Sequence, residues 1–146
     1  MAFDAGADYP LGTEQPDAVR TPGGLALEEL TLDALRAGRL DAAEMRATAE
    51  TLHLQAEVAQ AAGRGQLAAN LDRAAELTAL PDELILEIYT ALRPHRSTQD
   101  ELEQWAARLE RGYQAPLTAT FVREAKAVYA ERGLLSAGER AGTPPV

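Results

Sequence analysis

The stretch PDELILEIYTALRPHRSTQDELEQWAARL, residues 81–109, decides the fold. In its first half Leu84, Ile88 and Leu92 recur every four residues, so they lie on one face of a helix that starts at the first proline. Pro94 ends this helix, because proline donates no backbone hydrogen bond and the residue before it avoids helical angles. The sequence therefore predicts a helix followed by an exposed turn around Pro94.

A second helix is predicted directly after this turn. Ser97 is expected to be its N-cap, because a serine side chain can accept a hydrogen bond from an otherwise unpaired backbone N–H. Asp100 and Glu101 fall in the first turn, where the helix dipole favours negative charge. The inward face of this helix is expected to comprise Leu102, Trp105, Ala106 and Leu109.

Shorter helical patterns precede this stretch. Thr31 is predicted to cap a short helix that stops at Gly38. Asp41 is predicted to cap a further turn, with Glu44 at the position that completes a capping box. A longer amphipathic helix is expected over residues 48–62, because small and apolar residues recur there at three and four positions.

Two more helices complete the pattern. One opens at Gly65, and the last follows Pro116 and ends near Arg132. Trp105 and Phe121 are expected in the core, because large aromatics on apolar helix faces are usually buried. The apolar residues that mark the last helix are Leu117, Phe121, Ala125, Val128 and Tyr129.

We therefore predict an all-α fold: a small irregular helical bundle of about five main helices with an extended N-terminal arm. Residues 1–30 form the arm, because their closely spaced Pro and Gly residues prevent a regular helix. Residues 31–133 form the helical domain, and residues 134–146 are expected to be a disordered tail. No segment alternates as a β-strand does.

The charge is acidic and is concentrated near the N-terminus. The chain has 14 Lys and Arg against 23 Asp and Glu, a net charge of −9. Residues 1–60 hold eleven of the acids and four of the bases, so 4 − 11 = −7 of this charge lies there. Such a field repels a phosphate backbone, so we expect no binding to nucleic acid.

The composition also limits the chemistry and the location. There is no cysteine, which excludes disulfides, thiolate metal sites and a cysteine nucleophile. No apolar run reaches the ~18 residues of a membrane span, and the acidic N-terminus is unlike a secretory signal. We expect a cytoplasmic protein that does not bind membranes.

Few residues are candidates for catalysis. His53 and His95 lack a second histidine or a ligand carboxylate at metal-binding spacing, so exposed structural histidines are the simpler interpretation. Asp82, Glu83 and Glu87 cluster at the start of a helix, where electrostatics alone favours acids. We expect no catalytic, cofactor-binding or metal-binding residue in this chain.

An apolar patch and three arginines are candidates for binding a partner. Tyr9 and Leu11 flank Pro10 in the arm, where few local groups can cover them; the alternative is that they lie on the chain's own core. Arginine binds carboxylates through two parallel hydrogen bonds and is enriched at interfaces. The arginine candidates, for which a structural salt bridge is the alternative, are Arg93, Arg96 and Arg123.

Several motifs resemble the small subunit of adenosylcobalamin-dependent diol and glycerol dehydratases. The most specific is the run Leu92-Arg93-Pro94-x-Arg96-Ser97 between two helices. The likeness extends in consistent order from about residue 8 to residue 133. The other matching runs are Asp8-Tyr9-Pro10-Leu11, Arg73-Ala74-Ala75-Glu76-Leu77-Thr78, residues 81–89, and Phe121-Val122-Arg123-Glu124-Ala125 with Tyr129 and Arg132.

The resemblance implies a non-catalytic subunit of a larger enzyme. In that family a large barrel subunit carries the active site, a medium subunit helps to hold adenosylcobalamin, and the helical small subunit packs on the large one, in a dimer of heterotrimers. The complex converts a 1,2-diol into an aldehyde and water by a radical mechanism. If so, Tyr9 and Leu11 are expected to be buried only in the complex.

Two departures and one alternative accompany this interpretation. Relatives in bacterial microcompartments often carry a longer N-terminal extension, whereas seven residues precede Asp8 here, so encapsulation through this subunit is not expected. The end from Ser136 to Val146 differs from the short basic end of relatives, without an expected effect on catalysis. The alternative function is a stand-alone helical adaptor. Whether propane-1,2-diol or glycerol is the substrate does not follow from this chain.

Overall fold

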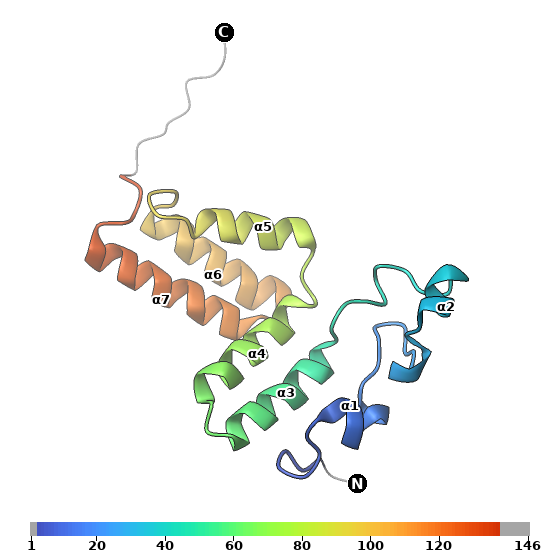
Figure 1. Ribbon diagram of the computed structural model, residues 1–146. Coiled ribbons are helices and arrows are strands. Elements are labelled where there is room, and N and C mark those ends of the chain that lie inside the picture. Colours follow the sequence, from blue (N-terminus) through green and yellow to red (C-terminus); the bar gives the residue numbers. More distant parts are fainter. Residues whose placement is uncertain (1–2, 138–146) are drawn as a thin grey trace. The chain divides into compact units, whose positions relative to one another are not determined.

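The computed structural model describes residues 3–137, and within that range it contains helices and no strand (Figure 1). An isolated bridge between Arg20 and Ala26 is the only extended pairing in this part of the chain. The predicted all-α fold is confirmed. In chain order the elements are α1 (Leu11–Glu14), the 3-10 helices η1 (Pro16–Ala18) and η2 (Leu27–Glu29), α2 (Leu32–Arg36), α3 (Ala49–Ala61), α4 (Gly65–Leu77), α5 (Asp82–Ala91), α6 (Gln99–Tyr113) and α7 (Pro116–Arg132).

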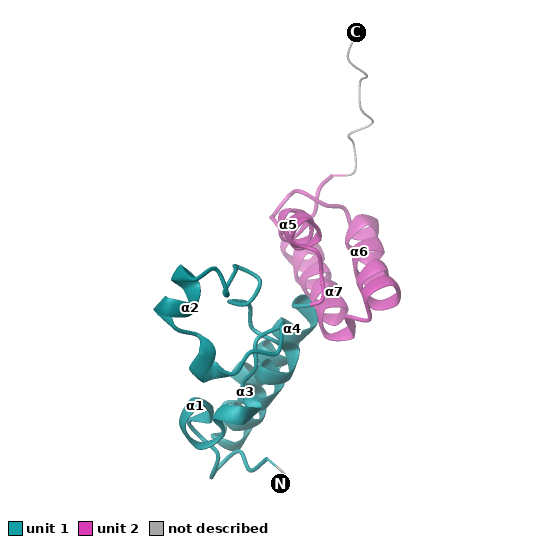
Figure 2. Ribbon diagram, turned by 90° about the vertical axis from the view of Figure 1, so that its right-hand side faces the viewer, with its two compact units in different colours: residues 1–78 teal, residues 79–146 magenta. Residues whose placement is uncertain are grey.

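The chain divides into two compact units, residues 1–78 and residues 79–146 (Figure 2). The boundary lies inside the range 31–133 that the sequence predicts to be one helical domain. The predicted arm belongs to the first unit, where short single-turn helices interrupt it. Most of the expected tail, residues 138–146, lies outside the described residues.

The first unit is built on the pair α3 and α4. Ala56 and Ala59 of α3 and Ala68 of α4 are buried together, with Leu71 packed against them. Their small side chains allow the two helices to lie close. Gly63 joins the helices at φ 71°, a left-handed angle that glycine adopts without steric cost.

Hydrogen bonds in this unit confirm two predicted caps and correct a third feature. The Thr31 hydroxyl accepts from Ala34 N, and the Asp41 carboxylate accepts from backbone N–H groups two and three residues later. The prediction that Glu44 completes a capping box is wrong. Its carboxylate instead accepts from Gly23 N at 3.2 Å, because the chain brings a loop of the arm beside it.

In the second unit α6 and α7 pack against each other around a small core. Leu102 and Leu109 of α6 and Val122 of α7 are the largest fully buried side chains. Ala106, between the two leucines, is also fully buried. Trp105 is half-buried, and the Arg108 guanidinium lies 5.2 Å from the centre of its ring.

The N-cap of α6 differs from the prediction by one residue. Thr98, not Ser97, caps the helix: its hydroxyl accepts from Glu101 N, and the Glu101 carboxylate accepts from Thr98 N at 2.8 Å. Both ends of a capping box are therefore satisfied. The Ser97 hydroxyl instead donates to the Ala91 carbonyl, across the turn from α5.

The buried face of α7 also differs from the prediction. Thr118, Ala119 and Val122 are buried against the rest of the unit, whereas Phe121 is 36% exposed, so the expectation that it lies in the core is wrong. The physical reason is the fit to α6: two small residues and one valine permit a close approach that a phenylalanine would prevent. The apolar residues of α7 that remain at the surface are Leu117, Phe121 and Val128.

Candidate functional site: a groove and an arginine turn

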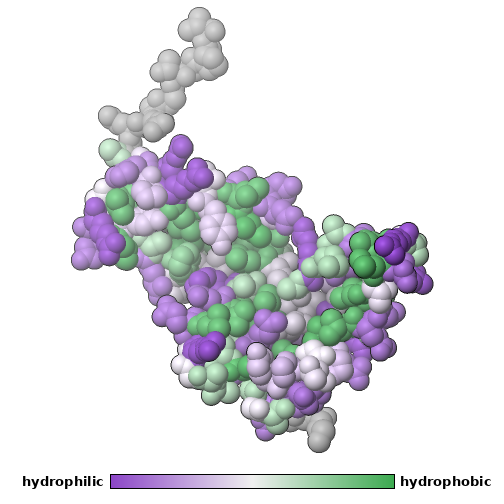
Figure 3. Space-filling model, in the orientation of Figure 1, coloured by the Kyte–Doolittle hydropathy of each residue, from purple (hydrophilic) through white to green (hydrophobic). Residues whose placement is uncertain are grey.

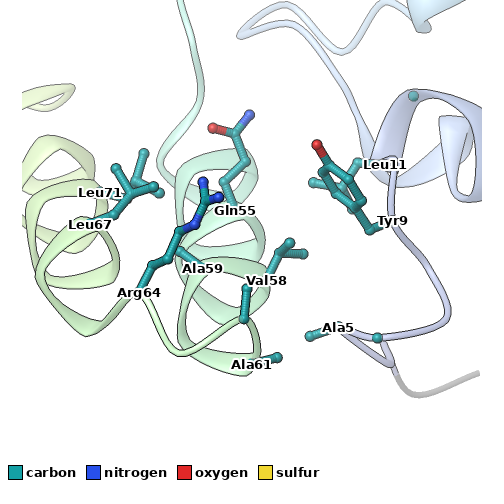
Figure 4. A pocket seen from close by; sticks show the side chains of 13 residues that line it. Ala5, Tyr9, Leu11, Gln55, Val58, Ala59, Ala61, Arg64, Leu67 and Leu71 are labelled. Atoms are coloured by element: carbon teal, nitrogen blue, oxygen red, sulfur yellow. The ribbon is translucent and has the colours of Figure 1, made fainter.

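A groove of about 720 Å³ lies in the first unit between the N-terminal arm and the α3–α4 pair (Figure 4). The arm provides one wall, because Leu11 is buried against the unit while Tyr9 stands at the edge. Val58 of α3 and Leu67 and Leu71 of α4 supply apolar surface on the helical side. The remaining lining residues are Ala5, Gly6, Gly12, Gln55, Ala59, Ala61, Ala62 and Arg64.

Hydrogen bonds within the arm hold the shape of the segment that lines this groove. The Asp8 carboxylate accepts from Asp4 N at 2.8 Å and from the Gln15 side-chain amide at 2.9 Å. Both bonds favour the charged form and lower the pKa of Asp8 below its ordinary value of 3.8, the bond from Asp4 N contributing most. The carboxylate thus links the start of the arm to the residue that follows α1.

The groove can bind, but its lining gives no basis for acid–base catalysis. The polar side chains among the described lining residues are Tyr9, Gln55 and Arg64, and none is a carboxylate or an imidazole. Across residues 3–137 no three His, Cys, Asp or Glu side chains lie close enough to hold a metal ion. The site is therefore shaped for contact with apolar groups.

The three arm residues predicted for an interface differ in their exposure to solvent. Tyr9 is 64% exposed and Pro10 is exposed, as a contact surface requires. Leu11 is only 7% exposed in the isolated chain, so the expectation that it is buried only in a complex is wrong. Leu11 is the first residue of α1 and the buried residue of that turn, whereas Tyr9 and Pro10 precede the helix.

Arg93 and Arg96 lie on a second feature, the turn over residues 93–96, which we call the arginine turn. The turn is exposed, as predicted, and neither arginine forms an ion pair with a described residue. His95 adopts φ 60°, which is unfavourable for a residue with a Cβ atom. Its backbone N–H donates to the Leu134 carbonyl at 2.7 Å, which helps to hold this conformation.

Bonds from outside the arginine turn hold both of its ends. The Tyr129 hydroxyl donates to the Leu92 carbonyl at 2.5 Å, and the Ser97 hydroxyl donates to the Ala91 carbonyl at 2.9 Å. Ser136 N donates to the Ser97 carbonyl at 2.8 Å. Leu92, Ser97 and Tyr129 all belong to the sequence motifs of the resemblance, so those motifs define a rigid turn.

Arg123 takes part in ion pairs within the chain, the alternative that the sequence left open. Its guanidinium donates to Glu103 at 3.0 Å and to Glu110 at 2.8 Å, and Lys126 also donates to Glu103. Lys126 and then Arg123 lower the pKa of Glu103 below its ordinary value. Glu110 and then Glu103 raise the pKa of Arg123. This network joins α6 to α7.

The remaining titratable candidates have structural positions. His53 Nδ1 lies 2.9 Å from Asp72 Oδ1 and so connects α3 to α4, while His95 is exposed on the arginine turn. Asp82, Glu83 and Glu87 are exposed on α5. None of the helices in the described part of the chain combines the length and the apolar character that crossing a membrane requires.

Sequence reasoning missed the groove and its arginine. It named no residue between the helices predicted over residues 48–62 and from Gly65, and it singled out no second apolar surface on the earlier helix. Val58, which lies outside the Ala56 and Ala59 face, was the available signal for a second apolar surface. The position of the arm, which closes the groove, depends on contacts between residues far apart in sequence.

These features define a class: an all-helical chain with an apolar groove, a rigid basic turn and no described cluster of catalytic side chains. Comparison with known proteins agrees with the resemblance found in the motifs. The family model described as dehydratase small subunit matches residues 5–136, which include both the groove and the arginine turn. The chain belongs to the dehydratase small-subunit family.

Curated relatives give the same result. The propanediol dehydratase small subunit of Citrobacter freundii is 54% identical over 125 residues, covering 86% of this chain and 73% of that protein. The propanediol dehydratase small subunit of Salmonella typhimurium (strain LT2) is 52% identical over 126 residues, with the same coverage.

Proposed function

We propose that this chain is the small subunit of a diol dehydratase, in which it supports the catalytic subunit and performs no chemical step itself. The observation that carries this proposal is the identity of more than half of the residues to two propanediol dehydratase small subunits over 86% of the chain. The complex would convert a 1,2-diol into an aldehyde and water. The substrate would bind to the large subunit.

The chemistry of the groove supports a role without catalysis. Removing hydrogen from a diol and moving its hydroxyl group requires groups that hold polar oxygens, and the described lining offers only Tyr9, Gln55 and Arg64 as polar side chains. These three side chains are also too few to bind the many polar amide groups around the corrin ring of adenosylcobalamin. We therefore assign the coenzyme, which would supply radical chemistry, to the large and medium subunits.

Exposed apolar side chains support a function as a subunit of a complex. Leu86 and Tyr89 of α5 are 68% and 58% exposed, and Leu32 of α2 is 69% exposed. Hydrophobic side chains reach the surface on the face shown in Figure 3. We expect partner subunits to cover some of these exposed side chains.

The arginine turn is a second proposed contact with the partner subunits. Arg93 and Arg96 are charged groups on a backbone that hydrogen bonds hold in place, so binding a partner carboxylate would cost little backbone entropy. Tyr9 and Pro10 form the proposed contact on the first unit. Arg123, by contrast, is proposed to contribute indirectly, by joining the two helices of its unit.

Co-expression tests the proposal. The tagged chain is expressed with candidate large and medium dehydratase subunits, and aldehyde formation is measured with adenosylcobalamin, with and without the chain. We expect co-purification and a loss of activity, or of active complex, when the chain is omitted. A chain that remains a monomer and leaves activity unchanged would refute the proposal and favour the stand-alone adaptor.

A further inference from the structure

We infer that the groove of the first unit receives a segment of a partner dehydratase subunit that places apolar side chains along α3 and α4 and a carboxylate against Arg64. This inference rests on the proposed function and names the surface and the chemistry of the contact. The apolar side chains would occupy the space between Tyr9, Val58 and Leu67.

The first step is the apolar character of the groove. Tyr9 is 64% exposed and Leu67 is 44% exposed, so both edges present hydrophobic surface to water in the isolated chain. Covering apolar surface is worth about 25 cal/mol per Å². The small floor residues Ala59, Ala61 and Ala62 leave room for side chains of another molecule.

The second step is the position of Arg64. Figure 4 shows its side chain in the middle of the lining residues, with Leu67 and Leu71 on one side and Val58 and Tyr9 on the other. It is the single base among the described lining residues and forms no ion pair within residues 3–137. A guanidinium beside apolar surface binds carboxylates strongly, through two parallel hydrogen bonds.

The third step distinguishes a protein segment from a small ligand. A diol would leave most of the apolar lining uncovered and would find few hydrogen-bond partners. A groove of about 720 Å³ is far larger than a diol, and its mostly apolar lining suits several apolar side chains in a row. The groove is also continuous with Tyr9 and Pro10, the proposed contact of the arm.

Binding measurements test whether the charge of Arg64 contributes to partner binding. The chain, its Arg64→Gln variant and its Arg39→Gln variant are titrated onto purified large and medium subunits. Arg39 is the matched control, because it is an exposed arginine of the same unit that lies outside the groove lining. We expect Arg64→Gln to weaken binding roughly 10- to 100-fold, the value of a lost charge-assisted hydrogen bond, and Arg39→Gln to leave it unchanged. If the Arg64→Gln and Arg39→Gln variants bind the partner subunits with equal affinity, the inference is overturned.

Cross-linking tests the identity of the occupant. Because the sequence lacks cysteine, Leu67→Cys introduces a unique thiol for a benzophenone label. Irradiation of the assembled complex should join the label to one partner segment that contains apolar residues and an Asp or Glu. Cross-links only within this chain, in a complex that has formed, would overturn the inference. If the unmodified chain binds no dehydratase subunit, the proposed function itself has failed.

Discussion

Replacing Leu102 with alanine tests whether α6 and α7 hold the second unit together. Leu102 has no exposed surface, so the substitution removes three buried carbons, worth about 2.4 kcal/mol at ~0.8 kcal/mol each. Ala106, one turn further along α6, is also fully buried, and its methyl group is too small to fill the cavity. The cavity therefore adds to the cost, and we expect a total loss of about 3–4 kcal/mol, within the range measured for buried leucines.

Leu86→Ala is the matched control, because it deletes the same atoms from a side chain that is 68% exposed on α5. Its expected cost is about 0.5 kcal/mol or less. Urea unfolding followed by Trp105 fluorescence measures both, since the only tryptophan of the chain lies on α6 and reports on the second unit. Equal losses in the free energy of unfolding for the two variants would refute the assignment of Leu102 to the core.

Three further predictions concern hydrogen bonds. Tyr129→Phe removes the bond to the Leu92 carbonyl and should cost about 1 kcal/mol, measured by the same fluorescence; an unchanged midpoint would show that this bond does not stabilise the turn. Thr98→Ala removes the N-cap of α6 and should also cost about 1 kcal/mol, whereas Gln99→Ala, one residue further, should be nearly neutral. Asp8 has a lowered pKa, so the stability that it contributes is present above pH ~4 and is lost as the pH falls through the lowered pKa. An NMR titration should therefore shift the Gln15 side-chain amide in acid, and Asp8→Asn should abolish that shift.

The sequence predicted those parts of the fold that neighbouring residues determine. Gly38 and Pro94 mark the ends of helices because their backbone preferences act at their own positions. Thr31 caps α2 because its hydroxyl reaches a backbone N–H three residues away. These helix ends and caps depend on neighbouring residues and not on contacts between residues far apart in sequence. For that reason their predicted positions agree with the structure.

The predictions that were wrong concern choices between neighbouring residues or contacts across the chain. Ser97 and Thr98 are equally suitable caps by composition, and the carbonyl of Ala91 decides between them by accepting from Ser97. Glu44 binds Gly23, which lies 21 residues earlier. Phe121 is displaced from the core because Ala119 and Val122 fit α6 more closely. In each case a tertiary contact overrides a valid local preference.

The residues that carried the family resemblance divide into two physical roles. Ser97 and Tyr129 use their side chains to hold the backbone of the arginine turn, and His95 tolerates an unfavourable angle within it. The side chains of Arg93 and Arg96 form no ion pair with any described residue. The hydrogen bonds hold the backbone from which both arginines project, and we propose that a partner surface recognises these arginines. The motif thus contains both the residues that hold the backbone of the arginine turn and the two arginines that the turn exposes.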